Sequence, residues 1–216
     1  MQTTESIPAE QKLHQLNQRI VTCRACPLNS MTDYTTSLGI PGDGTTLPSL
    51  LVIGEAPGAD EARLGIPFVG LSGSYMREKL YSVGATRDQF YITNVVKHRP
   101  PENRDPTLEE KKICGEAFLK QEINLLKPKI ILCVGRHSTL SLIQFAGLPK
   151  PKGSLRGLKF RYQGIPVLST WHPAYVLRNK DAETEEAFMQ DITLAWQVAQ
   201  QTIIRAEEVE VVYASS

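Results

Sequence analysis

The stretch at residues 50–58, LLVIGEAPG, constrains the fold of this chain more than any other. Its first four residues are apolar and follow Pro48, which is typical of a short strand covered on both faces of a sheet. Two glycines and a proline then break the strand into a tight loop. Because ligands of open parallel sheets bind just beyond the carboxyl ends of strands, we expect Glu55 at the mouth of a crevice. An ordinary strand-to-helix turn is the alternative.

Length, charge and cysteine content bound the class of protein. The chain has 216 residues, enough for one α/β domain with a sizeable core. Its net charge is +1, so contacts with a polyanion must come from local clusters of charge. No apolar run approaches the roughly 20 residues of a membrane span, and residues 1–8 lack the features of a secretory signal. We therefore expect a cytoplasmic protein without membrane contacts, whose four cysteines are metal ligands or buried thiols.

Hydrophobic periodicity and turn signals predict one domain at residues 9–206, between a disordered segment at 1–8 and a tail at 207–216. Predicted helices lie at residues 9–23, 72–83, 107–126, 136–146 and 183–206, and predicted strands at 50–53, 89–96, 129–135 and 166–170. A capping box opens the helix at Thr107. No GxxxxGK(S/T) motif occurs, which excludes a P-loop nucleotide hydrolase.

Three further side chains fall at or near strand ends on the same predicted edge. Asn94 is either a satisfied core or capping amide or a reader of a base edge, because an amide offers both a donor and an acceptor. Pro173 keeps His172 out of the helical region, so His172 lies in a loop unless it is a buried, hydrogen-bonded histidine. Phe68 is either a core-capping aromatic or a ring available for stacking.

Other polar positions have plainer interpretations. The locally basic loop at residues 97–104 can contact a phosphate backbone or can simply be solvated. His137 reads as a polar residue at the start of a helix, and Cys133 as a core thiol within an apolar strand. Cys23 and Cys26 form a CxxC motif, which is ambiguous between zinc, an iron–sulfur cluster and a redox pair, or is two unrelated thiols.

Taken together, GEAPGADE, PFVG, ITNVVK, RPPENRDPT and HPAYVLRN resemble the motifs of the family 4, iron–sulfur-containing uracil-DNA glycosylases. The resemblance runs from about residue 23 to residue 191. It implies an α/β fold of the uracil-DNA glycosylase type, a three-layer α/β/α sandwich with a central four-stranded parallel sheet. It also implies a monofunctional DNA-repair enzyme that hydrolyses the N-glycosidic bond of uracil in DNA and leaves an abasic site. The expected state is a monomer whose partner is uracil-containing DNA.

The resemblance assigns roles to the residues at the strand ends. Glu55 and His172 would be catalytic: the carboxylate orients water or stabilises cationic character at the sugar, and the imidazole donates to a uracil oxygen. Phe68 would stack on the extruded uracil, and Asn94 would read its edge. The full uracil pocket implied by the resemblance is Gly54, Glu55, Ala56, Gly58, Phe68, Asn94 and His172.

The resemblance also implies a DNA-binding loop at residues 174–178 that enters the minor groove. Leu177 or Arg178 would act as the wedge that fills the space of the flipped base. The expected DNA contacts are Ala174, Tyr175, Leu177 and Arg178.

The metal ligands depart from the family pattern at one position. The family holds its cluster with four cysteines, and Cys23, Cys26 and Cys114 match three of them. His98, in KHRPP, occupies the place of the remaining cysteine. Because imidazole replaces thiolate at the iron of Rieske centres, we expect these four residues to ligate an iron–sulfur cluster, [4Fe-4S] by resemblance. Zinc is the competitor, since three cysteines and a histidine are also an ordinary structural zinc set.

A rival from another functional class is a catalytically weak or inactive DNA-binding member of the same fold. The presence of Glu55, Asn94 and His172 favours the enzyme. A third possibility, a protein that traps uracil-DNA covalently, would need an added histidine-bearing loop that the sequence lacks.

Overall fold

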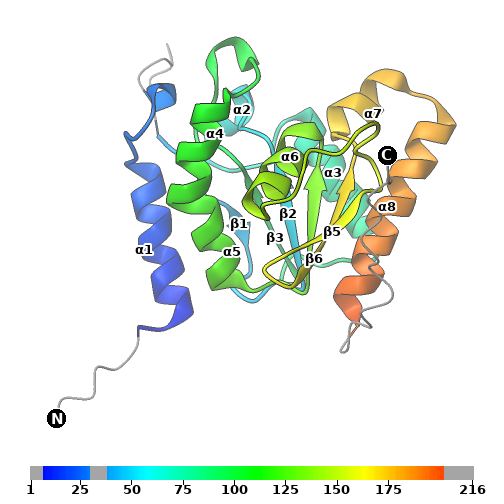
Figure 1. The fold of residues 1–216 in the computed structure, drawn as a ribbon, viewed down its shortest axis with the longest axis horizontal. Coiled ribbons are helices and arrows are strands. Elements are labelled where there is room, and N and C mark those ends of the chain that lie inside the picture. Colours follow the sequence, from blue (N-terminus) through cyan, green and yellow to red (C-terminus); the bar gives the residue numbers. More distant parts are fainter. Residues whose placement is uncertain (1–6, 30–37, 202–216) are drawn as a thin grey trace.

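The computed structural model of the chain describes residues 7–29 and 38–201 (Figure 1). Its strands are β1 (Asp43–Gly44), β2 (Leu50–Gly54), β3 (Phe90–Asn94), β4 (Ile130–Val134), β5 (Lys159–Tyr162) and β6 (Ile165–Thr170). Its α-helices are α1 (Ala9–Val21), α2 (Ala59–Leu64), α3 (Leu71–Ser82), α4 (Leu108–Cys114), α5 (Lys120–Leu126), α6 (Arg136–Phe145), α7 (Pro173–Asn179) and α8 (Ala182–Gln200). None of the described helices is long and apolar enough to cross a membrane.

The six strands form one sheet in the order β1-β3-β2-β4-β6-β5. The four central strands are parallel, which confirms the predicted arrangement, and β1 and β5 add antiparallel edges. The sequence did not reveal β1, because a two-residue strand carries no periodicity. In this topology the carboxyl ends of β2, β3, β4 and β6 meet at one edge of the sheet.

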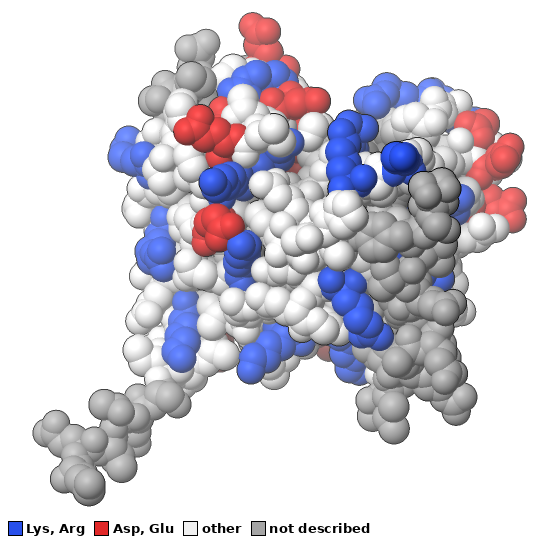
Figure 2. Space-filling view, in the orientation of Figure 1, with Lys and Arg blue, Asp and Glu red and all other residues white. Residues whose placement is uncertain are grey.

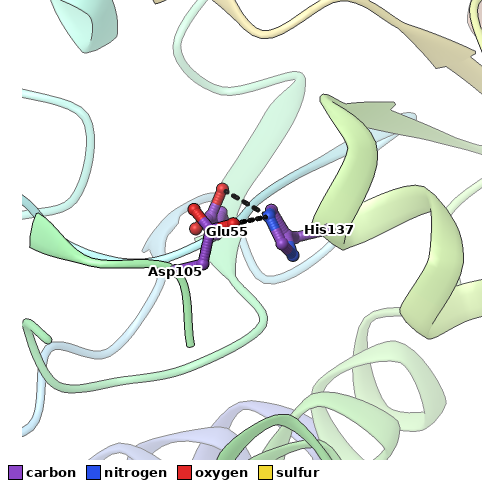
Figure 3. Close-up of side chains that lie close together, drawn as sticks. All are labelled: Glu55, Asp105 and His137. Atoms are coloured by element: carbon purple, nitrogen blue, oxygen red, sulfur yellow. Dashed lines mark ion pairs between the residues drawn. The ribbon is translucent and has the colours of Figure 1, made fainter. Parts of the chain in front are cut away.

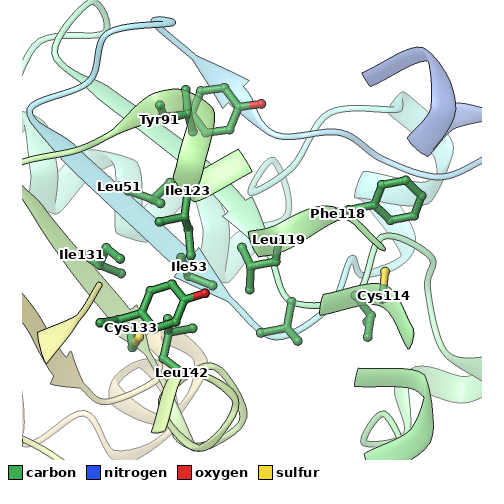
Figure 4. Close-up of a cluster of buried hydrophobic side chains, with 14 of the residues drawn as sticks. Leu51, Ile53, Tyr91, Cys114, Phe118, Leu119, Ile123, Ile131, Cys133 and Leu142 are labelled. Atoms are coloured by element: carbon green, nitrogen blue, oxygen red, sulfur yellow. The ribbon is translucent and has the colours of Figure 1, made fainter. Parts of the chain in front are cut away.

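The central strands are apolar throughout because helices cover both faces of the sheet, as Figure 1 shows. In β2, Leu51 and Ile53 face one cluster with residues of α1, α5 and α6, whereas Leu50 and Val52 face the other with residues of α3 and α8. Figure 4 shows Cys133 inside the first cluster. Its fully buried thiol confirms the interpretation as a core residue, and burial raises its pKa.

Most predicted helices are confirmed with shifted ends. The helix predicted at residues 107–126 begins at the predicted capping box, where the hydroxyl of Thr107 accepts from the backbone N–H of Glu110. It is interrupted by a π-helical turn at Gly115–Leu119, which the sequence did not signal. The predictions for residues 1–6, for the end of the last helix beyond residue 201 and for the tail at 207–216 lie outside the described residues.

The predicted loop at residues 174–178 was wrong, because these residues belong to α7. His172 is the N-cap of this helix, and its Nδ1 accepts from the backbone N–H of Ala174 at 3.2 Å. Pro173 then occupies the first turn, where proline needs no hydrogen-bond partner. Pro173 therefore has two effects, because it keeps the backbone of His172 extended and is also the first residue of α7.

Candidate active site

A cavity of about 570 Å³ lies at the carboxyl edge of the parallel strands. Glu55, Phe68, Asn94 and His172, which are far apart in the sequence, all line it. Of the other predicted pocket residues, Ala56 and Gly58 also line the cavity. The structure brings Glu55, Asn94 and His172 together because parallel strands point their ends to one edge. Phe68 reaches the cavity from the turn between α2 and α3, so its predicted place near a strand end was wrong.

Gly54, the last residue of β2, lies close to two of these side chains. A Cβ atom at this position would lie 2.5 Å from the Asn94 Oδ1 atom and 2.5 Å from the Phe68 ring. The missing side chain thus lets the amide and the aromatic ring approach each other over the end of β2. Both are largely buried, with Asn94 5% and Phe68 7% exposed. A flat polar ring that stacks on Phe68 would present its edge to the amide.

The Phe68 backbone is held in the left-handed region, with φ of 58°. Arg77 donates from Nε to the Phe68 carbonyl at 3.1 Å and from Nη2 to the Pro67 carbonyl at 2.9 Å. Asp43 holds the same guanidinium at 2.8 Å. Since φ is positive at a residue with a side chain, these contacts must offset a conformational cost of roughly 1 kcal/mol or more. The ring is therefore fixed by a network outside the cavity.

Glu61 ties the two loops of the cavity together. Its carboxylate accepts from the backbone N–H groups of Val69 and Gly70 at 2.9 and 2.8 Å, and from that of Gly58 at 3.0 Å. One buried carboxylate thus joins the GEAPG loop to the PFVG loop. No role for Glu61 could be predicted, because its place in GEAPGADE does not reveal which backbone groups its carboxylate contacts.

Glu55 begins the loop after β2, and its carbonyl accepts from the backbone N–H of Val96 at 3.1 Å. Burial raises the pKa of its carboxyl group to about 7, with a further contribution from the negative charge of Asp105. The ammonium of Lys111 opposes this rise. The carboxyl group therefore changes its ionisation within the neutral pH range.

His172 lines the cavity as a neutral imidazole. Because its Nδ1 accepts from the Ala174 backbone N–H, the ring proton of the neutral imidazole resides on Nε2. Burial, with the nearby positive charge of Arg178, lowers its pKa to about 4. Gly135 has φ of 97°, and a Cβ there would lie 3.0 Å from the His172 Cβ atom. The glycine at the end of β4 is what leaves room for this imidazole.

A second histidine, His137, joins the site from the start of α6, as Figure 3 shows. Its Nε2 atom lies 3.1 Å from Asp105 Oδ2 and 3.9 Å from Glu55 Oε2. The interpretation as an ordinary polar helix-start residue missed this role. The only signal was its position just after a strand end, which it shares with the other site residues.

The predicted DNA contacts lie together on α7. Ala174 and Arg178 line the cavity, Tyr175 and Arg178 are exposed, and Leu177 is half-buried. The Tyr175 ring packs against Trp171 with 5.4 Å between ring centroids. The face drawn in Figure 2 mixes basic and acidic side chains around an uncharged middle, so no broad cationic patch covers it.

The idea that the basic loop at residues 97–104 contacts phosphates fails for Lys97. This side chain is 0% exposed, and its Nζ atom donates to Glu122 at 2.6 Å, to Thr93 at 2.6 Å and to the Asn94 carbonyl at 2.8 Å. Arg104 forms a bidentate pair with Glu110 at 2.9 and 2.7 Å. The charges of this loop serve mainly internal contacts, because buried charges require partners.

The predicted metal ligands lie on three segments that meet. The Lys97 backbone N–H donates to Cys114 Sγ at 3.2 Å, which places the chain at His98 beside the end of α4. Burial raises the pKa of Cys114 to about 12. Cys26 and Cys114 belong to the same buried cluster, and Cys23 packs against it. Cys26, His98 and Cys114 are buried, and Cys23 is half-buried. The donor set fits a sulfur-rich metal centre with little access to water.

Comparison with known proteins agrees with these observations. The sequence model described as the Uracil DNA glycosylase superfamily matches residues 41–196. A Type-4 uracil-DNA glycosylase of Archaeoglobus fulgidus is 36% identical over 173 residues, which cover 77% of this chain and 84% of that protein. A protein of the same description from Sulfurisphaera tokodaii is also 36% identical over 173 residues, covering 77% and 76%. One from Pyrobaculum aerophilum is 38% identical over 189 residues, covering 85% and 91%.

Proposed function

This chain belongs to the uracil-DNA glycosylase superfamily, and we propose that it hydrolyses the N-glycosidic bond of uracil in DNA and leaves an abasic site. The observation that carries the proposal is the neutral imidazole of His172, which carries its proton on Nε2 and lines the same cavity as Asn94 and Glu55. These groups match the charges that the reaction develops. The predicted cytoplasmic location and monomeric state stay predictions.

Recognition comes first in the proposed mechanism. The enzyme extrudes the uracil nucleotide, which costs a few kcal/mol of unstacking, and stacking on Phe68 offsets part of this cost. Asn94 reads the base, because its amide donates to a uracil carbonyl and accepts from the ring N–H. The network around Gly54 and Arg77 holds both groups before the base arrives, so little conformational freedom is lost on binding.

Bond cleavage then separates charge between the base and the sugar. The electrons of the C1′–N1 bond leave with uracil, and the Nε2–H of His172 stabilises the negative charge that develops on the uracil oxygen. The ionised carboxylate of Glu55 stabilises the cationic sugar and orients the attacking water. A neutral imidazole suits this step. Its Nε2–H stays in place over the neutral pH range, so the strength of this hydrogen bond does not change with pH there.

The DNA contacts that we propose come from α7. Ala174 and Arg178 line the cavity, and Leu177 lies on the same short helix. A rigid helix that carries the wedge residue reaches the duplex with less loss of entropy than the loop that the sequence predicted. The half-buried Leu177 and exposed Arg178 are the side chains placed to occupy the space of the flipped base.

We also propose that Cys23, Cys26, His98 and Cys114 hold an iron–sulfur cluster. Such a centre would link the segment after α1 to the segment after β3, and it would thereby stabilise the folded domain. The backbone N–H of Lys97 at Cys114 and that of Ala25 at Cys23 Sγ, 3.4 Å away, would stabilise ligating thiolates. The residues of the catalytic cavity are separate from this set.

The test of the proposed activity uses an oligonucleotide with one uracil, followed by alkali to reveal abasic sites. We expect strand breaks only after alkali, because no step of the mechanism cleaves the backbone. A matched oligonucleotide with thymine at the same position is the control. Strand cleavage without alkali would contradict the monofunctional mechanism. Binding to the uracil oligonucleotide without any excision would favour the inactive DNA-binding alternative.

A further inference from the structure

The side chains around Glu55 form a chain of contacts that the proposed mechanism does not use. Lys111 on α4 places its Nζ atom 3.1 Å from the Nδ1 atom of His137. On the other side of the ring, Nε2 lies 3.1 Å from Asp105 Oδ2 and 3.9 Å from Glu55 Oε2 (Figure 3). The imidazole thus stands between an ammonium group and two carboxylates.

These contacts determine where the ring proton of His137 resides. An ammonium group can only donate, so Nδ1 must be the acceptor of the contact with Lys111. The neutral ring then carries its proton on Nε2, which is the atom that faces both carboxylates. Burial, followed by the charge of Lys111, lowers the pKa of His137, so the ring is neutral in the neutral pH range.

We infer that His137 is a positioning residue that donates its Nε2–H to ionised Glu55 when DNA fills the cavity, with Lys111 fixing the tautomer. The inference deepens the proposed glycosylase function and rests on it. In the free protein the nearer acceptor is Asp105, whose side chain is 78% exposed. Both carboxylates line the cavity, and Glu55 is the one that the reaction requires in ionised form.

The charges around Glu55 explain why such a donor is useful. Burial and Asp105 raise the pKa of Glu55 to about 7, and Lys111 opposes them. DNA binding removes more water, which raises the pKa of a carboxyl group further unless a donor compensates. The other titratable side chains that line the cavity are Glu61, Arg104, Arg136, His172 and Arg178.

The same geometry also resembles a cation site, because one ligand atom from each of Glu55, Asp105 and His137 lies within 4.8 Å of the others. Two observations favour the hydrogen-bond assignment. A metal would need the lone pair of Nε2, whereas the contact with Lys111 places a proton there. The Lys111 ammonium also brings positive charge to the group that would have to bind a cation.

The first experiment needs no enzymatic activity. Long-range ¹H–¹⁵N NMR of ring-labelled protein reports the tautomer of each histidine. We expect His137 to be neutral with its proton on Nε2 near pH 7, and to lose this preference in Lys111→Met. Lys112→Met is the matched control, since Lys112 is an exposed lysine next to Lys111 on α4. A proton on Nδ1 in the unmodified protein, or a shift of the Nε2 resonance upon stoichiometric Zn²⁺, would overturn the assignment.

The second experiment measures single-turnover excision of uracil as a function of pH. Ionised Glu55 is required, so the rate rises with pH through the pKa of Glu55. His137→Phe removes the donor, and we expect this rise to move to higher pH, with excision about tenfold slower at pH 6 and within about twofold at pH 8.5. Lys111→Met should move it in the same direction, and Asp105→Asn in the opposite direction.

Two further variants separate positioning from mere structure. His137→Gln keeps an N–H donor and should restore most of the rate at low pH. The double variant Lys111→Met/His137→Phe should shift the profile further than His137→Phe alone, because the Lys111 charge also acts directly on Glu55, but by less than the sum of the two single shifts, because the effect of Lys111 on the tautomer needs the imidazole. Additive shifts, or a uniform loss of rate without any pH shift, would refute the inference. Failure of the unmodified protein to excise uracil would refute the proposed function. The NMR experiment tests the tautomer of His137 independently of that activity.

Discussion

The two sides of the active-site cavity are held in different ways. On the uracil side (Phe68, Asn94 and His172), neutral groups are fixed by the backbone, as where His172 accepts from the Ala174 N–H. On the sugar side (Glu55, Asp105 and His137), two carboxylates compete for the ring proton of the neutral His137, and Asp105 is largely exposed. Recognition of the base therefore rests on rigid geometry, whereas stabilisation of the sugar rests on an ionisation that pH and neighbouring charges can change.

Loss of the His172 donor is the substitution expected to have the largest effect. His172→Leu fills the half-buried position with an apolar side chain that cannot stabilise the departing uracil anion. We expect a 10²- to 10³-fold fall in the single-turnover rate, about the cost of removing one oxyanion donor. The fall should be the same at all pH values, because the donor is neutral throughout. A loss confined to low pH would show that the uracil side also titrates.

Asn94→Asp is the next test of the uracil side. A carboxylate cannot donate to a carbonyl oxygen, but it can accept from the exocyclic amine of cytosine. We expect the ratio of excision rates on uracil and cytosine to fall by about 10²-fold, mainly through the loss of the uracil rate. Parallel assays on oligonucleotides that differ only in this base give the ratio. An unchanged ratio would mean that Asn94 does not read the base.

Removal of the metal centre should also disturb the uracil side through Lys97. Its backbone N–H donates to Cys114 Sγ, and its Nζ atom donates to the Asn94 carbonyl. We expect Cys114→Ala and His98→Ala to lower metal content and to lower the melting temperature by about 5 °C or more. His98→Cys should keep the cluster.

Iron, sulfide and zinc analysis after anaerobic purification identifies the metal. Iron and sulfide near four per chain would support [4Fe-4S], and stoichiometric zinc without sulfide would refute the cluster while keeping the ligand set. If His98→Ala leaves metal and melting temperature unchanged while Cys114→Ala lowers both, His98 is not a ligand.

The pH dependence of the unmodified protein distinguishes the two sides directly. Glu55, with its pKa raised to about 7, is ionised and active above that pH, so the rate should fall about tenfold per unit below it. His172, with its pKa lowered to about 4, stays neutral over the same range and adds no second step. Single-turnover rates between about pH 5 and pH 9 provide the profile. A flat profile would show that Glu55 does not need to be ionised.

The smallest expected effect concerns contacts with DNA outside the cavity. Arg178→Ala should weaken binding to undamaged duplex about two- to threefold and reduce the slope of log K against log salt by about one. Lys180→Ala, an exposed residue just after the same helix, is the control. Overall binding should be weak, since the chain has a net charge of +1, and strongly salt-dependent, because contacts with phosphates release counterions. A slope unaffected by Arg178→Ala would remove this residue from the interface.

Much of the uracil side was predictable from the sequence for a simple reason. Buried parallel strands are apolar runs that stop at a polar residue, and their carboxyl ends share one edge. Glu55, Asn94 and His172 each follow or end such a run, so local sequence was sufficient to group them. The sharp turns at Gly54 and Pro173 were equally visible, although α7 replaced the predicted loop because His172 caps it.

The sugar side and the internal charges were decided by the tertiary structure. His137 and Lys111 lie on different helices, and Asp105 on a loop, so no spacing in the sequence reveals that they meet. From the sequence, Lys97 is expected to be a surface cation. In the structure it is buried and paired with Glu122, which is 25 residues away in the sequence. The sequence by itself determined the strand-end chemistry, because that depends on local periodicity. Only the folded chain decided which charges pair, because pairing depends on distances across elements and on the loss of water.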